Sequence, residues 1–382
     1  MKVSLLGVDF FSDNRGCAAL GYSAVNDLVK ACEARGEKLE FFAVVCNVGD
    51  KPLEYSDVKY KLEMLAPKKL SFWKECYKNF KESDIVIDFT GGDSFSDIYG
   101  FKRFLIYTLL KELAILSKTK FVLGPQTIGP FNGKTATRMA KKIIKKSYCC
   151  FARDSFSQQY AAKLTGKDIK LSTDVAFSLP CKTLKKIDTS SNNIGINISG
   201  LLWYGTPTFN PENHLTLDYR RYTTELIKTL VKDGEYNVYL IPHVFADTES
   251  VTENDLCASR EIQKMFPEVK IISDFETPME AKGYIAQMNT FIGARMHATI
   301  AAFSMGVPVI PFSYSRKFEG LFSDLQYGYL VKGTAMTTEE ALDTTLEWIK
   351  NPEPLKQEMA KTAEIIRNRR VAYTGFLESI NR

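Results

Sequence analysis

The chain has 382 residues, 50 Lys and Arg against 45 Asp and Glu, a net charge of +5 and 45% hydrophobic residues, as in an ordinary soluble globular protein. A surplus of five charges over this length does not predict a nucleic-acid-binding surface. The length predicts two domains, because a single hydrophobic core seldom grows beyond about 250–300 residues.

The sequence favours a cytoplasmic location. The apolar run after Lys2 is interrupted at Asp9, whereas an export signal needs about 7–15 apolar residues. The longest uncharged stretch, residues 296–315, contains two prolines and a histidine, so we expect a buried helix, a turn and a strand there. None of the eight cysteines forms a CxxC pair, which favours free thiols in a reducing compartment and no metal site.

In the first half of the chain, short runs rich in Val, Ile and Phe alternate with longer segments of helical periodicity. This alternation predicts a parallel sheet covered by helices. The predicted strands span residues 3–9, 39–46, 85–90, 121–126, 149–153 and 169–173. The clearest predicted helices span residues 17–35, 101–117, 135–147 and 155–164.

The alternation restarts after the polar segment 182–193, which is the best linker candidate. The next predicted strands span residues 194–198, 237–242, 269–272, 290–292 and 307–311. The predicted helices span residues 217–232, 254–265, 279–288 and 296–305. Two doubly wound domains follow from this pattern, with ligands expected at the carboxyl ends of strands.

We therefore expect an N-terminal Rossmann-like domain over residues 1–185 and a C-terminal Rossmann-like domain over residues 190–336. Residues 337–382 look wholly helical. Since this tail has no strand to join, it can pack back on the first domain.

Two loops of the first half follow predicted strands. Gly91, Gly92 and Asp93 follow one strand, and paired glycines allow backbone N–H groups to approach a ligand closely. Gln126 and Thr127 follow another, in a loop whose prolines restrict its shape. Either loop could equally be a simple connector, but neighbouring loops at one sheet edge favour a shared binding site.

In the second half, Arg295 and His297 stand where a strand gives way to a helix. A helix amino end favours an anion, a guanidinium binds a carboxylate or phosphate through two hydrogen bonds, and an imidazole exchanges protons near neutral pH. His297 could instead be an ordinary core histidine. Arg295 favours function, because a buried arginine needs an anionic partner and this segment contains no acidic residue.

Three further residues are candidates at strand ends of the second half. Arg316 and Lys317 open a helix, where positive charge opposes the helix dipole unless an anion is bound. His243 follows another strand and is expected near Arg295; the carboxylates after it have no metal-binding spacing.

A basic run, KKIIKK at residues 141–146, lies on a predicted helix. It is either a solvated face or a surface that attracts anionic lipid headgroups.

Together these motifs resemble the polysaccharide pyruvyl transferase family. The resemblance spans about residues 10–325 and rests on four elements: GGD at 91–93, LGPQTIGPF at 123–131, ARD at 152–154, and ARMHA at 294–298 with GVPV at 306–309. A weaker match begins at Asn14. The family often has Gly-Asp after this asparagine, where this chain has Gly16 and Cys17. The family usually has a third glycine after the pair that ends at Gly92, where this chain has Asp93.

This resemblance implies two Rossmann-like domains facing across a cleft, as in GT-B proteins, with phosphoenolpyruvate as donor substrate, no other cofactor, and a bacterial surface glycan as acceptor. It implies His297 as the acid-base group and Arg295 with Lys317 as anion-binding cations, with Arg316, Arg153 and His243 as further candidates. The loops at Asn14, Gly91, Gly92, Asp93, Gln126 and Thr127 would bind the acceptor or line the cleft. A lipid-linked acceptor would place the protein at the inner face of the cell membrane.

Two alternatives remain open. The same domains could form a GT-B-like glycosyltransferase that uses a nucleotide sugar. They could also form a non-catalytic anion-binding or glycan-binding module.

Overall fold

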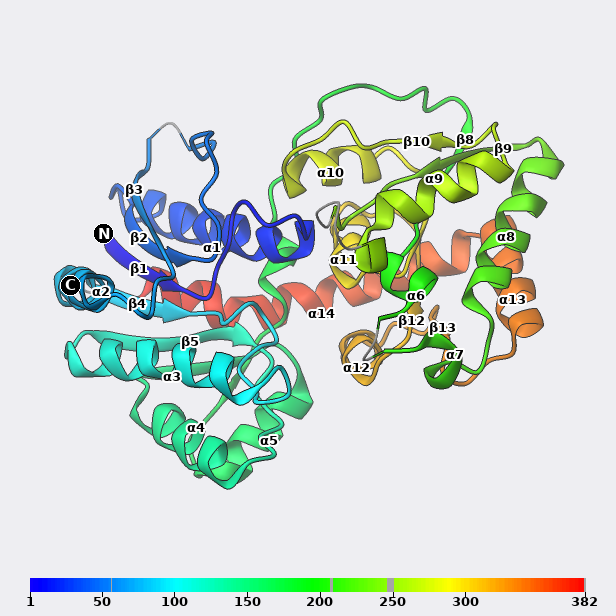
Figure 1. The fold of residues 1–382 in the computed structure, drawn as a ribbon. Coiled ribbons are helices and arrows are strands. Elements are labelled where there is room, and N and C mark those ends of the chain that lie inside the picture. Colours follow the sequence, from blue (N-terminus) through cyan, green and yellow to red (C-terminus); the bar gives the residue numbers. More distant parts are fainter. Residues whose placement is uncertain (56, 207–208, 246–250, 381–382) are drawn as a thin grey trace. The chain divides into compact units, whose positions relative to one another are not determined.

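The computed structural model describes residues 1–55, 57–206, 209–245 and 251–380, apart from four side chains (Asn213, Val251, Arg316 and Lys317). The chain forms two compact units. Unit 1 comprises Met1–Ser12, Leu20–Ser178 and Ile366–Arg382, and unit 2 comprises Asp13–Ala19 and Leu179–Ile365. Figure 1 labels most of their helices and strands.

Unit 1 contains a parallel sheet with the strand order β3-β2-β1-β4-β5-β6-β7. Its strands are β1 (Lys2–Leu6), β2 (Glu40–Val45), β3 (Lys59–Met64), β4 (Ile85–Asp88), β5 (Lys120–Gln126), β6 (Cys149–Ala152) and β7 (Lys170–Leu171). The central strands are buried on both faces, as their unbroken apolar runs predict.

Helices cover both faces of this sheet. They are α1 (Arg15–Glu33), α2 (Leu70–Glu82), α3 (Phe101–Leu116), α4 (Lys134–Lys146), α5 (Ser155–Thr165) and, from Ile366 onward, α14 (Glu353–Glu378). Helices α2 to α5 share one hydrophobic core, and α4 packs between α3 and α5. Tyr373 of α14 packs its ring against Phe89 and Phe151, and Arg370 pairs with Asp27 of α1 at 2.8 Å.

Unit 2 repeats the architecture with the order β10-β9-β8-β11-β12-β13. Its strands are β8 (Asn192–Asn197), β9 (Tyr236–Leu240), β10 (Lys270–Ile271), β11 (Thr290–Gly293), β12 (Val309–Ser313) and β13 (Val331–Lys332). Its helices are α6 (Gly200–Tyr204), α7 (Pro211–His214), α8 (Tyr219–Asp233), α9 (Asp255–Met265), α10 (Pro278–Ile285), α11 (Met296–Ser304), α12 (Arg316–Asp324) and α13 (Thr338–Lys350). Helices α8, α9 and α13 contribute to one core, and α10 packs against α11.

The expected fold class, two doubly wound parallel α/β domains, is confirmed by both sheets. Five of the strands and α-helices were missed: β3, β13, α2, and the short helices α6 and α7. Strand β3 reads KYKLEM and is partly exposed at the sheet edge, so it lacks the apolar run of a buried strand. No helix in the described part of the chain is long and apolar enough to cross a bilayer.

The unit boundaries differ from the simple division expected from the sequence. The main part of unit 2 begins at Leu179, before the 182–193 segment. Unit 2 also includes Asp13–Ala19, from the N-terminal part of the chain. Asn14 forms an antiparallel bridge with Val244, and the N–H of Phe245 donates to the carbonyl of Asp13 at 3.0 Å. These backbone bonds join the early segment to the later unit.

Candidate functional site

In unit 2 the chain runs outward from β8 to β9 and β10, then returns to β11 on the other side of β8. Ligands of doubly wound folds bind at such a switch point, beyond the carboxyl ends of the strands. Asn197 ends β8, and Arg295 follows β11 as the residue before α11. The candidate site therefore begins where these two strands end.

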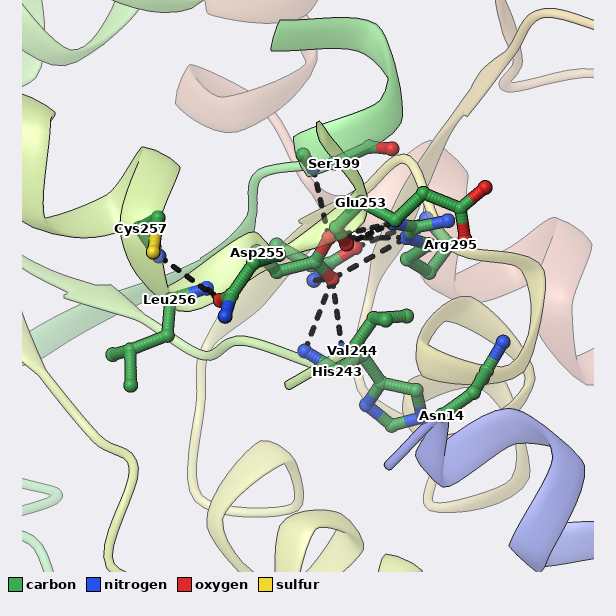
Figure 2. Close-up of polar contacts among 12 residues, drawn as sticks. Asn14, Ser199, His243, Val244, Glu253, Asp255, Leu256, Cys257 and Arg295 are labelled. Carbon is green, nitrogen blue, oxygen red and sulfur yellow. Dashed lines mark hydrogen bonds and ion pairs between the residues drawn. The ribbon is translucent and has the colours of Figure 1, made fainter. Parts of the chain in front are cut away.

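A buried carboxylate, Asp255, organises this site (Figure 2). Asp255 is the first residue of α9 and is fully buried. Its Oδ1 accepts from the N–H of Gly200 at 2.8 Å, and its Oδ2 accepts from the N–H groups of His243 and Val244, each at 3.1 Å. The amide of Asn197 donates to Oδ2 at 3.2 Å. One carboxylate thus ties together the loops that follow β8 and β9.

Arg295 completes this network. Its Nη2 lies 2.8 Å from Oδ1 of Asp255, its Nε donates to the same carboxylate, and its backbone N–H donates to Oδ1 of Asn197 at 3.0 Å. Burial lowers the pKa of the guanidinium, but the charge of Asp255 and its hydrogen bond, with smaller contributions from Tyr314 and Glu253, together raise it further, so Arg295 stays charged. Arg295 does not need a ligand as its counter-ion, contrary to the expectation from the sequence, because Asp255, distant in sequence, supplies the charge.

The start of α1 also belongs to this site. The side chain of Asn14 accepts from the N–H of Gly16 at 2.9 Å, which caps the helix, and the N–H of Arg15 donates to the carbonyl of His243 at 2.9 Å. A Cβ atom on Gly16 would lie 2.5 Å from Nδ1 of His297. Glycine is therefore required for the imidazole to lie against the first turn of α1.

His243 is a buried, neutral histidine. Its side chain is 2% exposed, and its Nδ1 has no hydrogen-bond partner among the described residues. Burial lowers its pKa to about 3, and the positive charges of His297, Arg15 and Arg295 act in the same direction. His243 can therefore meet an anion only as a neutral hydrogen-bond donor, not as a cation.

Unit 1 gathers other candidate residues around Arg153, which follows β6. The guanidinium pairs with buried Asp174 at 2.8 Å, and its Nε donates to Oγ1 of Thr127 at 2.9 Å. The N–H of Thr127 donates to the carbonyl of Gly92 at 2.7 Å. Burial lowers the pKa of Arg153, but Asp174, Asp93 and Asp154 raise it more. Arg153 thus has a resident counter-ion, as Arg295 does.

The glycine loop after β4 lies directly on this arginine. Gly92 has a φ of 79°, and a Cβ on it would lie 3.1 Å from Nη1 of Arg153. The N–H of Gly91 donates to the carbonyl of Gly7, which follows β1, at 2.6 Å. Asp93 accepts from the Tyr99 hydroxyl at 2.6 Å. The loop therefore lies at the switch point between β1 and β4, where the sequence placed a ligand contact.

Gln126 lies in the core rather than at a loop surface. It is fully buried, and its amide donates to the carbonyl of Asp88 at 2.7 Å. Asp88 in turn pairs with buried Lys111 at 3.1 Å, and Thr90 donates to the same carboxylate at 2.7 Å. Gln126 therefore supports the strand ends from within the core.

The side chains of Arg316 and Lys317 lie outside the described part of the chain, so their predicted roles stay predictions. Their backbone forms the first turn of α12. Ser315 caps that helix by accepting from the N–H of Phe318.

Sequence reasoning missed Asp255, Asn197, Asp88 and Lys111. Asp255 follows Asn254, whose side chain accepts from the N–H groups of Leu256 and Cys257. An Asn-Asp pair opening a helix looks like ordinary capping, so no local signal marks Asp255 as the centre of a network.

The fold defines the class of protein. Two parallel-sheet α/β domains with these strand orders form a GT-B-like fold, and solved GT-B proteins align over nearly the whole chain. Anabaena Alr3699/HepE in complex with UDP and glucose has a TM-score of 0.61 and 12% identity, with 99% of this chain and 100% of that chain covered. Staphylococcus aureus MnaA with UDP has a TM-score of 0.57 and 14% identity, covering 98% and 97%.

A third structure, the UDP-GlcNAc 2-epimerase of Neisseria meningitidis bound to UDP-GlcNAc, has a TM-score of 0.55 and 13% identity, covering 99% of this chain and 100% of that chain. Among curated proteins, none matches the sequence. The family model described as "Polysaccharide pyruvyl transferase" matches residues 16–316. The chain belongs to the polysaccharide pyruvyl transferase family.

Proposed function

We propose that the protein transfers the pyruvyl group of phosphoenolpyruvate to two hydroxyls of one sugar, forming a cyclic ketal during synthesis of a bacterial surface polysaccharide. The observation that supports this most directly is the convergence of Arg295, His297 and His243 at the switch point of unit 2. Phosphoenolpyruvate carries a phosphate and a carboxylate, and helix α11 directs its amino end toward the same place.

In the proposed reaction, a proton is added to the methylene carbon of phosphoenolpyruvate and a sugar hydroxyl oxygen bonds to C2. The C2–O bond to phosphate then breaks, and the second hydroxyl oxygen bonds to C2. One hydroxyl proton ends on the new methyl group and the other on phosphate, so the products are a ketal and inorganic phosphate.

His297 is the proposed acid-base group, because it is the half-buried imidazole of the site, whereas His243 is buried and neutral. Arg295 would contribute fixed positive charge beside the developing phosphate. Its ion pair with Asp255 fixes the guanidinium before the reaction begins. The guanidinium then need not reorient as negative charge develops, which is the condition for efficient electrostatic stabilisation.

The test incubates the purified protein with phosphoenolpyruvate and a panel of glycan acceptors, following phosphate release and the mass of the sugar product. His297→Gln should lower kcat by about 10²- to 10⁴-fold, the usual contribution of general acid-base catalysis. His214→Gln is the matched control, because His214, the last residue of α7, is exposed and stacks on Phe209. Equal turnover in both variants would remove His297 from the mechanism.

A second candidate function is a nucleotide-sugar glycosyltransferase, since solved proteins of the same fold were crystallised with UDP or UDP-sugars. The two candidate functions differ in the donor substrate that they use. Turnover with a UDP-sugar and none with phosphoenolpyruvate would favour this second candidate.

A further inference from the structure

Positive charge is concentrated in one part of unit 1. Residues 97–170 contain fifteen Lys and Arg and four Asp and Glu, a surplus of eleven, whereas the whole chain carries only +5. The rest of the chain is therefore net negative. Two of these cations, Lys111 and Arg153, are buried and paired with Asp88 and Asp174. Most of the other Lys and Arg side chains in this range are exposed.

Helix α4 carries six of these fifteen cations. It has five lysines, one arginine and no acidic residue. Its buried side consists of small and aliphatic residues, and all six cations are exposed: Lys134, Arg138, Lys141, Lys142, Lys145 and Lys146. Among the residues that the structure describes, only Lys142 of these six has an acidic partner, Glu112 of α3 at 2.8 Å. The cations of α4 do not contribute to the core, so folding of the unit does not require them.

Exposed apolar side chains border this face. Leu116, the last residue of α3, is 64% exposed, and Tyr148, two residues after α4, is 61% exposed. A hollow of about 300 Å³ beside Tyr148 is also lined by Ile115, which precedes Leu116, and by Lys118, Lys120 and Lys146. Figure 1 shows α3 and α4 side by side on the same face of the sheet. Cations and exposed apolar groups therefore share one surface.

We propose that this surface, formed by α4, Leu116 and Tyr148, binds an anionic lipid bilayer. Lysines attract anionic headgroups as mobile point charges, and Leu and Tyr side chains enter the interface between headgroups and acyl chains. A nucleic-acid site would favour arginine, which forms bidentate contacts with phosphates and bases, but five of the six cations on α4 are lysines.

The surface lies away from the proposed active-site loops of unit 1. Lys120 begins β5 and Tyr148 precedes β6, so the hollow lies at the amino ends of the strands. The loops at Gly92 and Thr127 lie at the carboxyl ends. Bilayer binding and ligand binding to those loops therefore need not compete, and the inference does not depend on the donor substrate.

The test is cosedimentation of the full-length protein with phosphatidylcholine vesicles, with and without phosphatidylglycerol. Binding should require phosphatidylglycerol and fall as salt is added, because salt screens surface charge. Replacing Lys141, Lys145 and Lys146 by Gln together should weaken binding on the order of 100-fold, at about fivefold per lysine. A thermal transition close to that of the wild type checks that these exposed replacements leave the fold intact.

The matched control replaces three exposed lysines of unit 2, Lys232, Lys264 and Lys350, by Gln. It removes the same charge and should leave binding nearly unchanged. Leu116→Gln should weaken vesicle binding at every salt concentration, because it removes an apolar contact. The proposal is overturned if phosphatidylglycerol vesicles do not bind, if the two triple variants behave alike, or if single-stranded RNA binds more tightly and Leu116→Gln has no effect.

Discussion

Arg295 and Asp255, separated by 40 residues, form a buried ion pair in which Nη2 lies 2.8 Å from Oδ1. Asp255 is fully buried, and the Arg295 side chain is 12% exposed. The pair connects the start of α9 with the start of α11, and it also closes the loops after β8 and β9. A resident carboxylate therefore holds the arginine that the family resemblance assigns to the donor substrate.

Asp255→Asn should lower the free energy of unfolding by about 3–5 kcal/mol, because it leaves Arg295 buried without its counter-ion. Chemical denaturation followed by tryptophan fluorescence measures the change, since Trp203 lies in the core of unit 2. The control is Glu339→Gln, whose partner Arg221 is more than half exposed, and it should cost less than about 1 kcal/mol. Similar losses in both variants would mean that the buried pair is not a stabilising centre.

Gly16→Ala should reduce activity more than stability. The new Cβ would lie 2.5 Å from Nδ1 of His297, so the imidazole must move, while alanine favours the helix by up to about 1 kcal/mol. Steady-state kinetics and thermal denaturation measure the two effects. Gly375→Ala in α14 is the control, because no atom lies within 4 Å of its added Cβ. It should raise stability and leave kcat unchanged; an equally active Gly16→Ala enzyme would argue against this placement of His297.

The buried neutral His243 should make the protein less stable in acid. Its pKa is lowered from 6.5 to about 3, so between these values the unfolded chain binds a proton that the folded chain does not. This contribution to stability is complete above pH 6.5 and is lost as the pH falls toward 3, by up to about 1.4 kcal/mol per pH unit. Denaturation of the wild type and His243→Gln at several pH values should show a shallower dependence in the variant. Identical slopes would contradict the assignment.

Lys111→Met should destabilise unit 1 by about 3–5 kcal/mol, because Asp88 would remain buried and charged. The double variant Lys111→Met with Asp88→Asn should recover part of this loss, since neither charge is then left without a partner. Trp73, which packs against the core of unit 1, is a fluorescence probe for the denaturation. A double variant that loses the sum of the two single losses would show that the two residues do not interact.

The sequence by itself determined the alternation of strands and helices and therefore the two parallel sheets. It also marked the loops at strand ends, including the glycines at 91 and 92 and the Arg295-His297 segment. These features are local, because burial of a strand and the start of a helix depend on residues close together in the chain.

The tertiary structure alone decided which residues meet. Strand order brings Asp255 to Arg295, places Asn14 and Gly16 beside His243 and His297, and turns Gln126 into the core against Asp88. Periodicity describes the environment of one element, whereas an ion pair between elements depends on which strand ends become neighbours. The packing of the whole sheet determines which strand ends are neighbours. It places Asp255 beside Arg295, so the arginine has a counter-ion within the protein and does not require a ligand to supply one.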